Sequence, residues 1–164
     1  GKVHPGYGQP PLCYYTESID HFKPDLVELV YENDLNPTIP ALINHLESKS
    51  IKFNIFSSGN LRDDINVLLR AKALVVGMGT FARGILTLSE NVETFYSFQK
   101  GFTESFMSSE SIKLNSEGII IFDKNGLYKT KILSGNWSNS LEQRKLMLQY
   151  DKENLSIETY RLDS

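Results

Sequence analysis

Apolar positions along this chain repeat with two periods, one helical and one typical of short buried strands. Leu12, Tyr15, Ile19 and Phe22 lie at helical spacing, so we predict a helix over residues 12–22 with one apolar stripe, which Pro24 ends. Short apolar runs and further helical patterns then alternate. They predict strands at 26–31, 52–56, 73–76 and 92–98, and helices opened by Asn36-Pro37, at 61–71 and at 80–89.

This alternation predicts an α/β fold, a Rossmann-like doubly wound parallel sheet with right-handed crossovers. In that strand order the first strand is central, yet the helix at 12–22 is preceded by no strand beyond Lys2-Val3. A sheet without its middle strand exposes backbone donors and acceptors on two inner edges. We therefore expect an upstream segment before Gly1, or a partner, to complete the sheet.

The apolar pattern weakens after residue 98. Residues 99–116 are polar and predict a loop, whereas the Asn125-Gly126 turn between apolar runs at 118–122 and 127–132 predicts a β-hairpin. A helix is predicted at 140–150, capped by Ser138 or Asn139, with a charged tail that frays. We assign residues 1–98 to the Rossmann-like domain and residues 99–164 to a C-terminal extension of that same domain.

Composition and charge narrow the class of protein. The 164 residues are 40% hydrophobic and 23% charged, as in an ordinary globular domain, soluble as given. A net charge of −3 without basic runs argues against nucleic-acid and anionic-membrane partners. No apolar run approaches the roughly 20 residues that span a bilayer. The sequons at Asn136 and Asn154 are consistent with the Golgi lumen of the secretory pathway, if the segment belongs to a longer anchored chain.

One cysteine and three scattered histidines leave little scope for metal chemistry. Cys13 can form no internal disulfide, and its place in the apolar phase of a helix predicts a core position. No histidine or cysteine pair has the spacing of a zinc site, and the sequence after Asp123 lacks the bidentate acid of a calcium loop. We expect no metal and no cofactor.

A glycine-containing turn gives the first indication of function. Gly77 and Gly79 stand between a predicted strand and the helix starting at Thr80, at the sheet edge where open α/β proteins bind ligands. Unpaired N–H groups at a helix start attract anions such as a diphosphate, and Thr80 adds a donor. The alternative is an ordinary chain reversal with Thr80 as N-cap. Because the third glycine of a dinucleotide fingerprint and a Walker A lysine are absent, a dehydrogenase or P-loop NTPase is disfavoured.

The wider pattern around this turn is more specific. Asp63-Asp64 begins a helix that carries Leu68-Leu69, and the apolar strand Leu74-Val75-Val76 leads through Gly77-x-Gly79 to Thr80-Phe81. Over residues 55–98 this resembles the C-terminal motif region of the GT-B fucosyltransferases, the superfamily of α1,2-, α1,6- and protein O-fucosyltransferases. That superfamily uses the turn to hold the diphosphate of GDP-fucose. The resemblance implies the C-terminal, nucleotide-sugar-binding half of a GT-B glycosyltransferase.

The resemblance also assigns roles at the ligand-facing edge. It makes Gly79, Thr80 and the backbone of Phe81 diphosphate contacts, with Arg83 a second cation, and it puts Asp64 or Asp63 near the nucleoside. Ser57, Ser58 and Gly59 would lie along the same edge. Each residue has a plain alternative role, as a helix cap, as a charge that complements the helix dipole, as a solvated surface group or as part of the core.

The activity implied by the resemblance is inverting, metal-independent transfer of fucose from GDP-fucose to a glycan or glycoprotein hydroxyl. Glu32, at the C-terminal end of the strand at 26–31, and His4, in an N-terminal loop, are the candidate catalytic residues, although either could be an ordinary surface residue. The superfamily's H-x-R-x-[GD] element does not occur, so we expect the donor-binding half, with activity of this chain alone in doubt. A non-catalytic nucleotide-binding or protein-interaction module remains the alternative.

Overall fold

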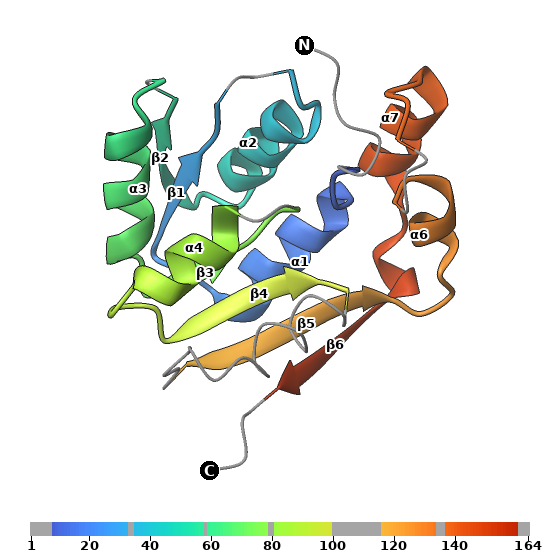
Figure 1. Cartoon of the computed structure of the whole chain (residues 1–164). Helices are drawn as coiled ribbons and strands as arrows, with labels where there is room; N and C mark the ends of the chain where they lie inside the picture. The colour runs from blue at the N-terminus through green and yellow to red at the C-terminus, as the bar shows by residue number, and fades with distance from the viewer. Residues whose placement is uncertain are drawn as a thin grey trace.

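Helices and strands alternate from α1 (Leu12–Phe22) to β4 (Thr94–Phe98) (Figure 1). The structure, a computed structural model, describes residues 8–32, 35–57, 59–78, 81–99, 116–133 and 137–160. In chain order the elements are α1 (Leu12–Phe22), β1 (Leu26–Val30), α2 (Thr38–Ser48), β2 (Lys52–Phe56), α3 (Leu61–Arg70), β3 (Ala73–Val75), α4 (Phe81–Leu88), β4 (Thr94–Phe98), β5 (Glu117–Asp123), α6 (Leu127–Lys131), α7 (Leu141–Gln149), η1 (Lys152–Asn154) and β6 (Leu155–Tyr160).

Two mainly parallel sheets organise these elements. Strands β1 and β2 form a parallel pair with Leu26 opposite Lys52. The second sheet has the order β3-β4-β5-β6, in which β3, β4 and β5 are parallel and β6 is antiparallel to β5. A helix connects β1 to β2 and β3 to β4, as parallel neighbours require. The fold is therefore the Rossmann-like α/β arrangement predicted from the sequence.

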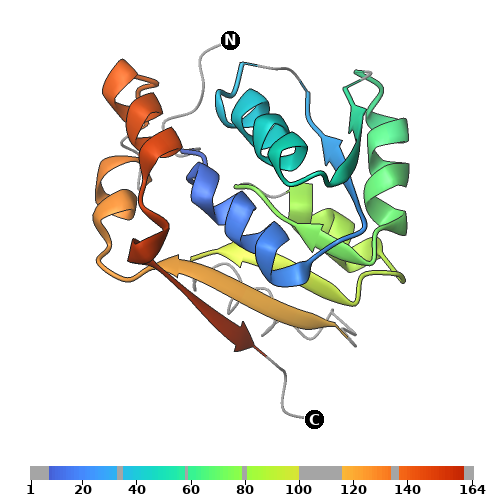
Figure 2. The same ribbon diagram turned by 180° about the vertical axis from the view of Figure 1, so that it is seen from behind.

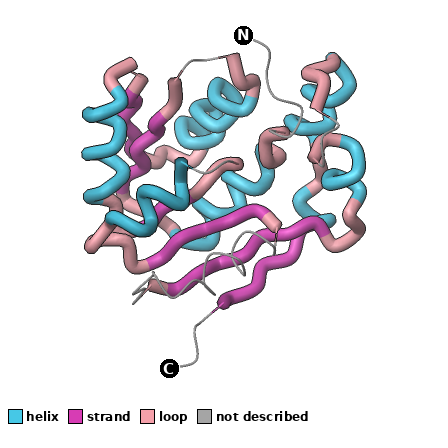
Figure 3. Tube along the Cα trace, viewed as in Figure 1, coloured by secondary structure: helices cyan, strands magenta, loops and turns pink. Residues whose placement is uncertain are grey.

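Helices cover both faces of the four-stranded sheet. Figures 1 and 2 view the molecule from opposite sides, and α4 lies in front of the sheet in one view and α1 in the other. Along β4, Tyr96 and Phe98 belong to a buried cluster with Tyr14 of α1, whereas the alternate residue Phe95 packs with Ile85 of α4. Figure 3 shows the same layering by element type. A strand buried on both faces reads as a continuous apolar run, which is how β4 was predicted.

Helix α1 has the predicted bounds but a different buried face. Its buried residues are Cys13, Tyr14, Ser18 and Ile19, whereas Phe22 of the predicted stripe is 42% exposed. The hydroxyl of Tyr14 lies 2.7 Å from Val76 O and 2.9 Å from Tyr96 O, which turns this face of the helix toward the sheet. The buried Ser18 hydroxyl donates to Tyr14 O. Because the hydroxyl groups of Tyr14 and Ser18 form hydrogen bonds, they can be buried, and the buried face of α1 differs from the purely apolar stripe. The core position predicted for Cys13 is confirmed.

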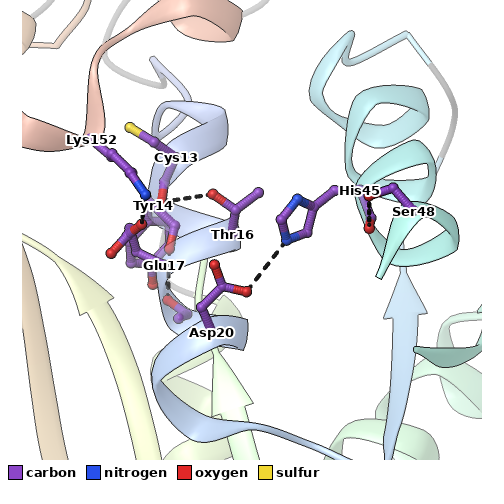
Figure 4. Close-up of polar contacts among 9 residues, drawn as sticks. Cys13, Tyr14, Thr16, Glu17, Asp20, His45, Ser48 and Lys152 are labelled. Carbon is purple, nitrogen blue, oxygen red and sulfur yellow. Dashed lines mark hydrogen bonds and ion pairs between the residues drawn. The ribbon is translucent and has the colours of Figure 1, made fainter. Parts of the chain in front are cut away.

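The far side of α1 packs against α2. Ile19 forms a buried cluster with Leu42 and Leu46 of α2. Figure 4 shows the polar contacts around this packing, in which Asp20 Oδ1 lies 3.5 Å from His45 Nε2. This contact is partly exposed and is an ion pair only when His45 is protonated. Because partly exposed pairs contribute about 1 kcal/mol or less, the apolar cluster holds the two helices together.

The β-hairpin predicted around Asn125-Gly126 is wrong. Gly126, at φ +68°, leads instead into the short helix α6, because the buried Asp123 carboxylate accepts a hydrogen bond from Tyr128 N at 2.8 Å. The antiparallel partner of β5 is β6, in the segment predicted to fray. Helix α7 is confirmed, but its cap is Ser140, whose Oγ accepts from Gln143 N, rather than Ser138 or Asn139. Most of the predicted polar loop at 99–116 lies outside the described residues.

Candidate functional site

A cavity of about 540 Å³ lies at the carboxyl ends of β1 and β3, between α3 and α4. This is the edge at which open α/β sheets bind ligands, and the volume suits a small organic molecule. The lining is mainly apolar, with a few polar groups. It consists of Val30, Tyr31, Glu32, Gly59, Leu61, Asp64, Leu68, Leu74, Val75, Val76, Gly77, Phe81, Ala82 and Ile85.

The first turns of two helices meet at this cavity. Leu61 opens α3 and Phe81 opens α4, and both side chains line the cavity. Each helix start carries the positive end of the helix dipole. At α3, Arg62 N donates to the side chain of Asn60, and Asp63 N and Asp64 N donate to its carbonyl. The first turn of α3 contains Asp63 and Asp64, which offset that charge, whereas the first turn of α4 contains no acidic residue. An anionic group of a ligand is therefore favoured at α4 rather than at α3.

Asp64 is the least satisfied polar group in the cavity wall. Its Oδ1 atom is buried and has no hydrogen-bond partner in the described part of the chain. A carboxylate can only accept hydrogen bonds, and leaving a buried acceptor unpaired costs about 1 to 3 kcal/mol. A ligand with an N–H or O–H group at this position would remove that cost. Asp63 is exposed and does not line the cavity, whereas Asp64 does.

Four of the residues predicted to form the site come together here. Glu32, Gly59, Asp64 and Phe81 all line the cavity, although they come from four different segments. Ser57 is exposed and is not part of the lining. His4, Ser58, Gly79, Thr80 and the side chain of Arg83 lie outside the described residues, and only the backbone of Arg83 is placed, within α4.

Sequence reasoning missed the apolar walls and Tyr31. Tyr31 follows β1 directly and lies beside Glu32 in the lining, so its place at a strand end was the available signal. The sequence assigns Leu68, Leu74 and Ile85 only to helices and strands, yet all three line the cavity. A mainly apolar lining with one unpaired acceptor can hold an aromatic ring that carries a donor on its edge.

Comparison with known proteins adds no family. A scan against protein-family models and a search of curated proteins each found no match. Within the described ranges, no helix combines the length and apolar character needed to cross a bilayer. In the same part of the chain, no group of three or more His, Cys, Asp or Glu side chains is arranged to hold a metal ion.

Proposed function

We propose that this chain is the donor-binding half of an inverting, metal-independent glycosyltransferase that transfers fucose from GDP-fucose to a glycan or glycoprotein hydroxyl. The observation that carries the proposal is the buried, unpaired Oδ1 of Asp64 in a cavity at the carboxyl edge of the sheet. The motif that resembles the fucosyltransferases supplies the same aspartate and the same edge from sequence alone.

The cavity divides into parts that suit the parts of a nucleotide sugar. Guanine carries neighbouring N–H donors on one edge of a flat ring, which matches the Asp64 carboxylate between the apolar walls. The diphosphate is then assigned to the start of α4, where no acidic side chain opposes it. Uracil offers one ring N–H, so a guanine nucleotide satisfies the carboxylate better.

Glu32 is the group proposed to act on the acceptor. It lies on the cavity lining and is exposed, so an acceptor hydroxyl can reach it. In the proposed step the acceptor oxygen forms a bond to the anomeric carbon, and the bond from that carbon to the diphosphate oxygen breaks. The hydroxyl proton goes to the Glu32 carboxylate, and the electron pair of the broken bond goes to the diphosphate. Backbone N–H groups at the start of α4 stabilise that charge.

Binding titrations of single variants test the donor site. Calorimetric titration with GDP, GDP-fucose, UDP and UDP-glucose is expected to show guanine-nucleotide binding that weakens about 10- to 100-fold in Asp64→Asn, because a charge-assisted hydrogen bond is worth about 1.5–3 kcal/mol. Asp63→Asn is the matched control, since it removes the same charge one residue away on an exposed side chain. Equal losses in the two variants would refute a specific role for Asp64.

The catalytic part of the proposal has a separate readout. With GDP-fucose as donor, transfer of fucose to a glycan acceptor should be lost in Glu32→Gln. The affinity for GDP should stay within about twofold, since Gln keeps the size of the side chain. Binding of GDP without transfer in the parent chain would instead indicate a non-catalytic nucleotide-binding module. Absence of nucleotide binding would indicate an interaction module.

A further inference from the structure

A slot separates the two sheets of this protein. No ladder joins β1 to β3 in the described part of the chain, although both strands run beside the same space. A cavity of about 800 Å³ fills that space, lined by residues of β1, of β3 and of the two helices α1 and α3. Both strand edges that face it belong to the interior of the fold, because β2 and β4 lie on their outer sides.

Backbone polar groups of both strands point into the slot. Tyr31 N donates to Phe56 O, so the odd-numbered residues of β1 turn toward β2, and the N–H and C=O groups of Glu28 and Val30 face the opposite way. In the same manner Val76 N donates to Tyr96 O, so Ala73 and Val75 of β3 face away from β4. Glu28, Val30, Ala73 and Val75 all line the slot. The N–H and C=O groups of β1 therefore face those of β3 across the slot.

The side chains around the slot are those that normally cover a central strand. Tyr15 and Ile19 of α1 line it on one face, and Val67, Leu68 and Ala71 of the α3 region line it on the other. Val27 and Leu29 of β1 remain half-exposed, although parallel strands with helices on both faces are normally buried. The slot therefore matches an extended segment that is apolar on both faces and that pairs with two neighbours at once.

We infer that a β-strand occupies this slot, parallel to β1 and β3, and that the segment N-terminal to Gly8 supplies it. The resulting strand order is β2-β1-new strand-β3-β4-β5-β6, one continuous sheet. This inference does not depend on the proposed function, because it rests only on the two unpaired edges and the cavity between them.

The position of α1 identifies the source of the strand. The helix lies along the slot, with Tyr15, Ser18 and Phe22 in its lining, and it leads directly into β1. A strand followed by α1 and then by the adjacent parallel strand β1 makes the usual right-handed connection of α/β proteins. The chain enters α1 through Gln9, which lines the slot and whose carbonyl accepts from the Tyr128 hydroxyl at 2.7 Å. The described chain thus begins at the slot, which is why we assign the strand to the segment that precedes it.

Amide hydrogen exchange on the full chain, as its gene encodes it, tests the inference. The amides of Glu28, Val30 and Val75 face the slot, and those of Leu74 and Val76 face β4, so the second pair is an internal control in the same molecule. With a strand in place, the slot-facing amides should exchange as slowly as the control amides, within about tenfold, at every protein concentration. Slot-facing amides that exchange roughly 100-fold faster than the controls would overturn the inference.

Two further measurements separate the possible sources of the strand. Protection that rises with protein concentration would assign the slot to a second copy and overturn the N-terminal origin. Deletion of the residues before Gly8 should release the slot-facing amides while the amides that face β4 stay protected, and retained protection at the slot would overturn the inference. Where the deletion variant does not fold, the concentration series on the full chain decides alone.

Discussion

The hydroxyl of Tyr14 is expected to be one of the main supports of the ligand-facing edge. It lies 2.7 Å from Val76 O and 2.9 Å from Tyr96 O, so a single side chain of α1 ties the end of β3 to the middle of β4. Tyr14→Phe removes this oxygen and keeps the ring, which packs edge-on against Tyr15 and tilted against Phe98. The substitution therefore tests the hydrogen bonds with little disturbance of the packing.

The loss of stability in Tyr14→Phe depends on which hydrogen bonds the carbonyl groups of Val76 and Tyr96 keep. One O–H group donates fully to only one acceptor, and Val76 O is the nearer. Tyr96 O keeps its bond from Val76 N at 3.0 Å, whereas the buried Val76 O loses its donor. One lost hydrogen bond and one unpaired acceptor cost about 2 kcal/mol together. In a domain of this size such a loss lowers the melting temperature by about 4–8 °C.

Chemical denaturation with urea measures this difference directly. We expect the unfolding free energy of Tyr14→Phe to fall by about 2 kcal/mol with an unchanged m-value. Tyr160→Phe is the matched control, because Tyr160 is half-buried and its hydroxyl makes no hydrogen bond among the described residues. A change in unfolding free energy below about 0.5 kcal/mol in both variants would refute the reasoning. The Tyr14 hydroxyl would then contribute no more to stability than a surface group does.

Two further predictions concern the C-terminal part and the core. Asp123→Ala should lower the unfolding free energy by about 3 kcal/mol in urea titrations, because it removes the acceptor of Tyr128 N and of the Tyr150 hydroxyl, and an unchanged midpoint would contradict this. Burial raises the pKa of the Cys13 thiol from its ordinary 9.0 to about 12, so the unfolded chain loses this proton first. That part of the stability is present below pH 9.0 and is lost as the pH rises toward about 12. Cys13→Ala should therefore reduce the pH slope of stability between these values by about 1.4 kcal/mol per pH unit, and an identical slope would contradict burial of the thiol.

Apolar periodicity predicts most of the helices and strands in the first half of the chain. Helix α1 and strand β2 have the predicted bounds, since Pro11 precedes the helix, Pro24 follows it, and Phe53, Ile55 and Phe56 favour the strand. Strand β6 shows the limit of this approach. Leu155 and Ile157 alternate with Ser156 and Glu158, which is the signal of a half-buried strand, but the surrounding charges led to the prediction of a frayed tail.

Side-chain hydrogen bonds explain the other differences between prediction and structure. Asn125-Gly126 favours a hairpin when only local turn chemistry is considered. The Asp123 carboxylate instead caps α6 and accepts from Tyr150, which lies 27 residues further along the chain. A contact between such distant residues cannot be found from local pattern. The same holds for Tyr14, whose place in the core depends on carbonyl groups of β3 and β4.

The candidate site was predictable in position but not in detail. Strand ends that precede helix starts located the edge, and they brought Glu32, Gly59 and Phe81 into consideration. The resemblance put Asp64 or Asp63 near the nucleoside, since both lie in the first turn of α3, and the packing of α3 brings Asp64 to the cavity. The apolar walls come from α3, β3 and α4, so they exist only once the sheet has formed.

The slot and the candidate site share a boundary, so the free energy of strand insertion is coupled to the free energy of ligand binding. Tyr31, Leu68, Leu74 and Gly77 line both spaces, so a strand in the slot would end against the wall of the site. Ordering that wall before a ligand arrives removes part of the entropic cost of binding. By reciprocity, a ligand that binds the ordered wall stabilises the strand in the slot by the same free energy. Strand insertion and nucleotide binding should therefore strengthen each other through this shared wall.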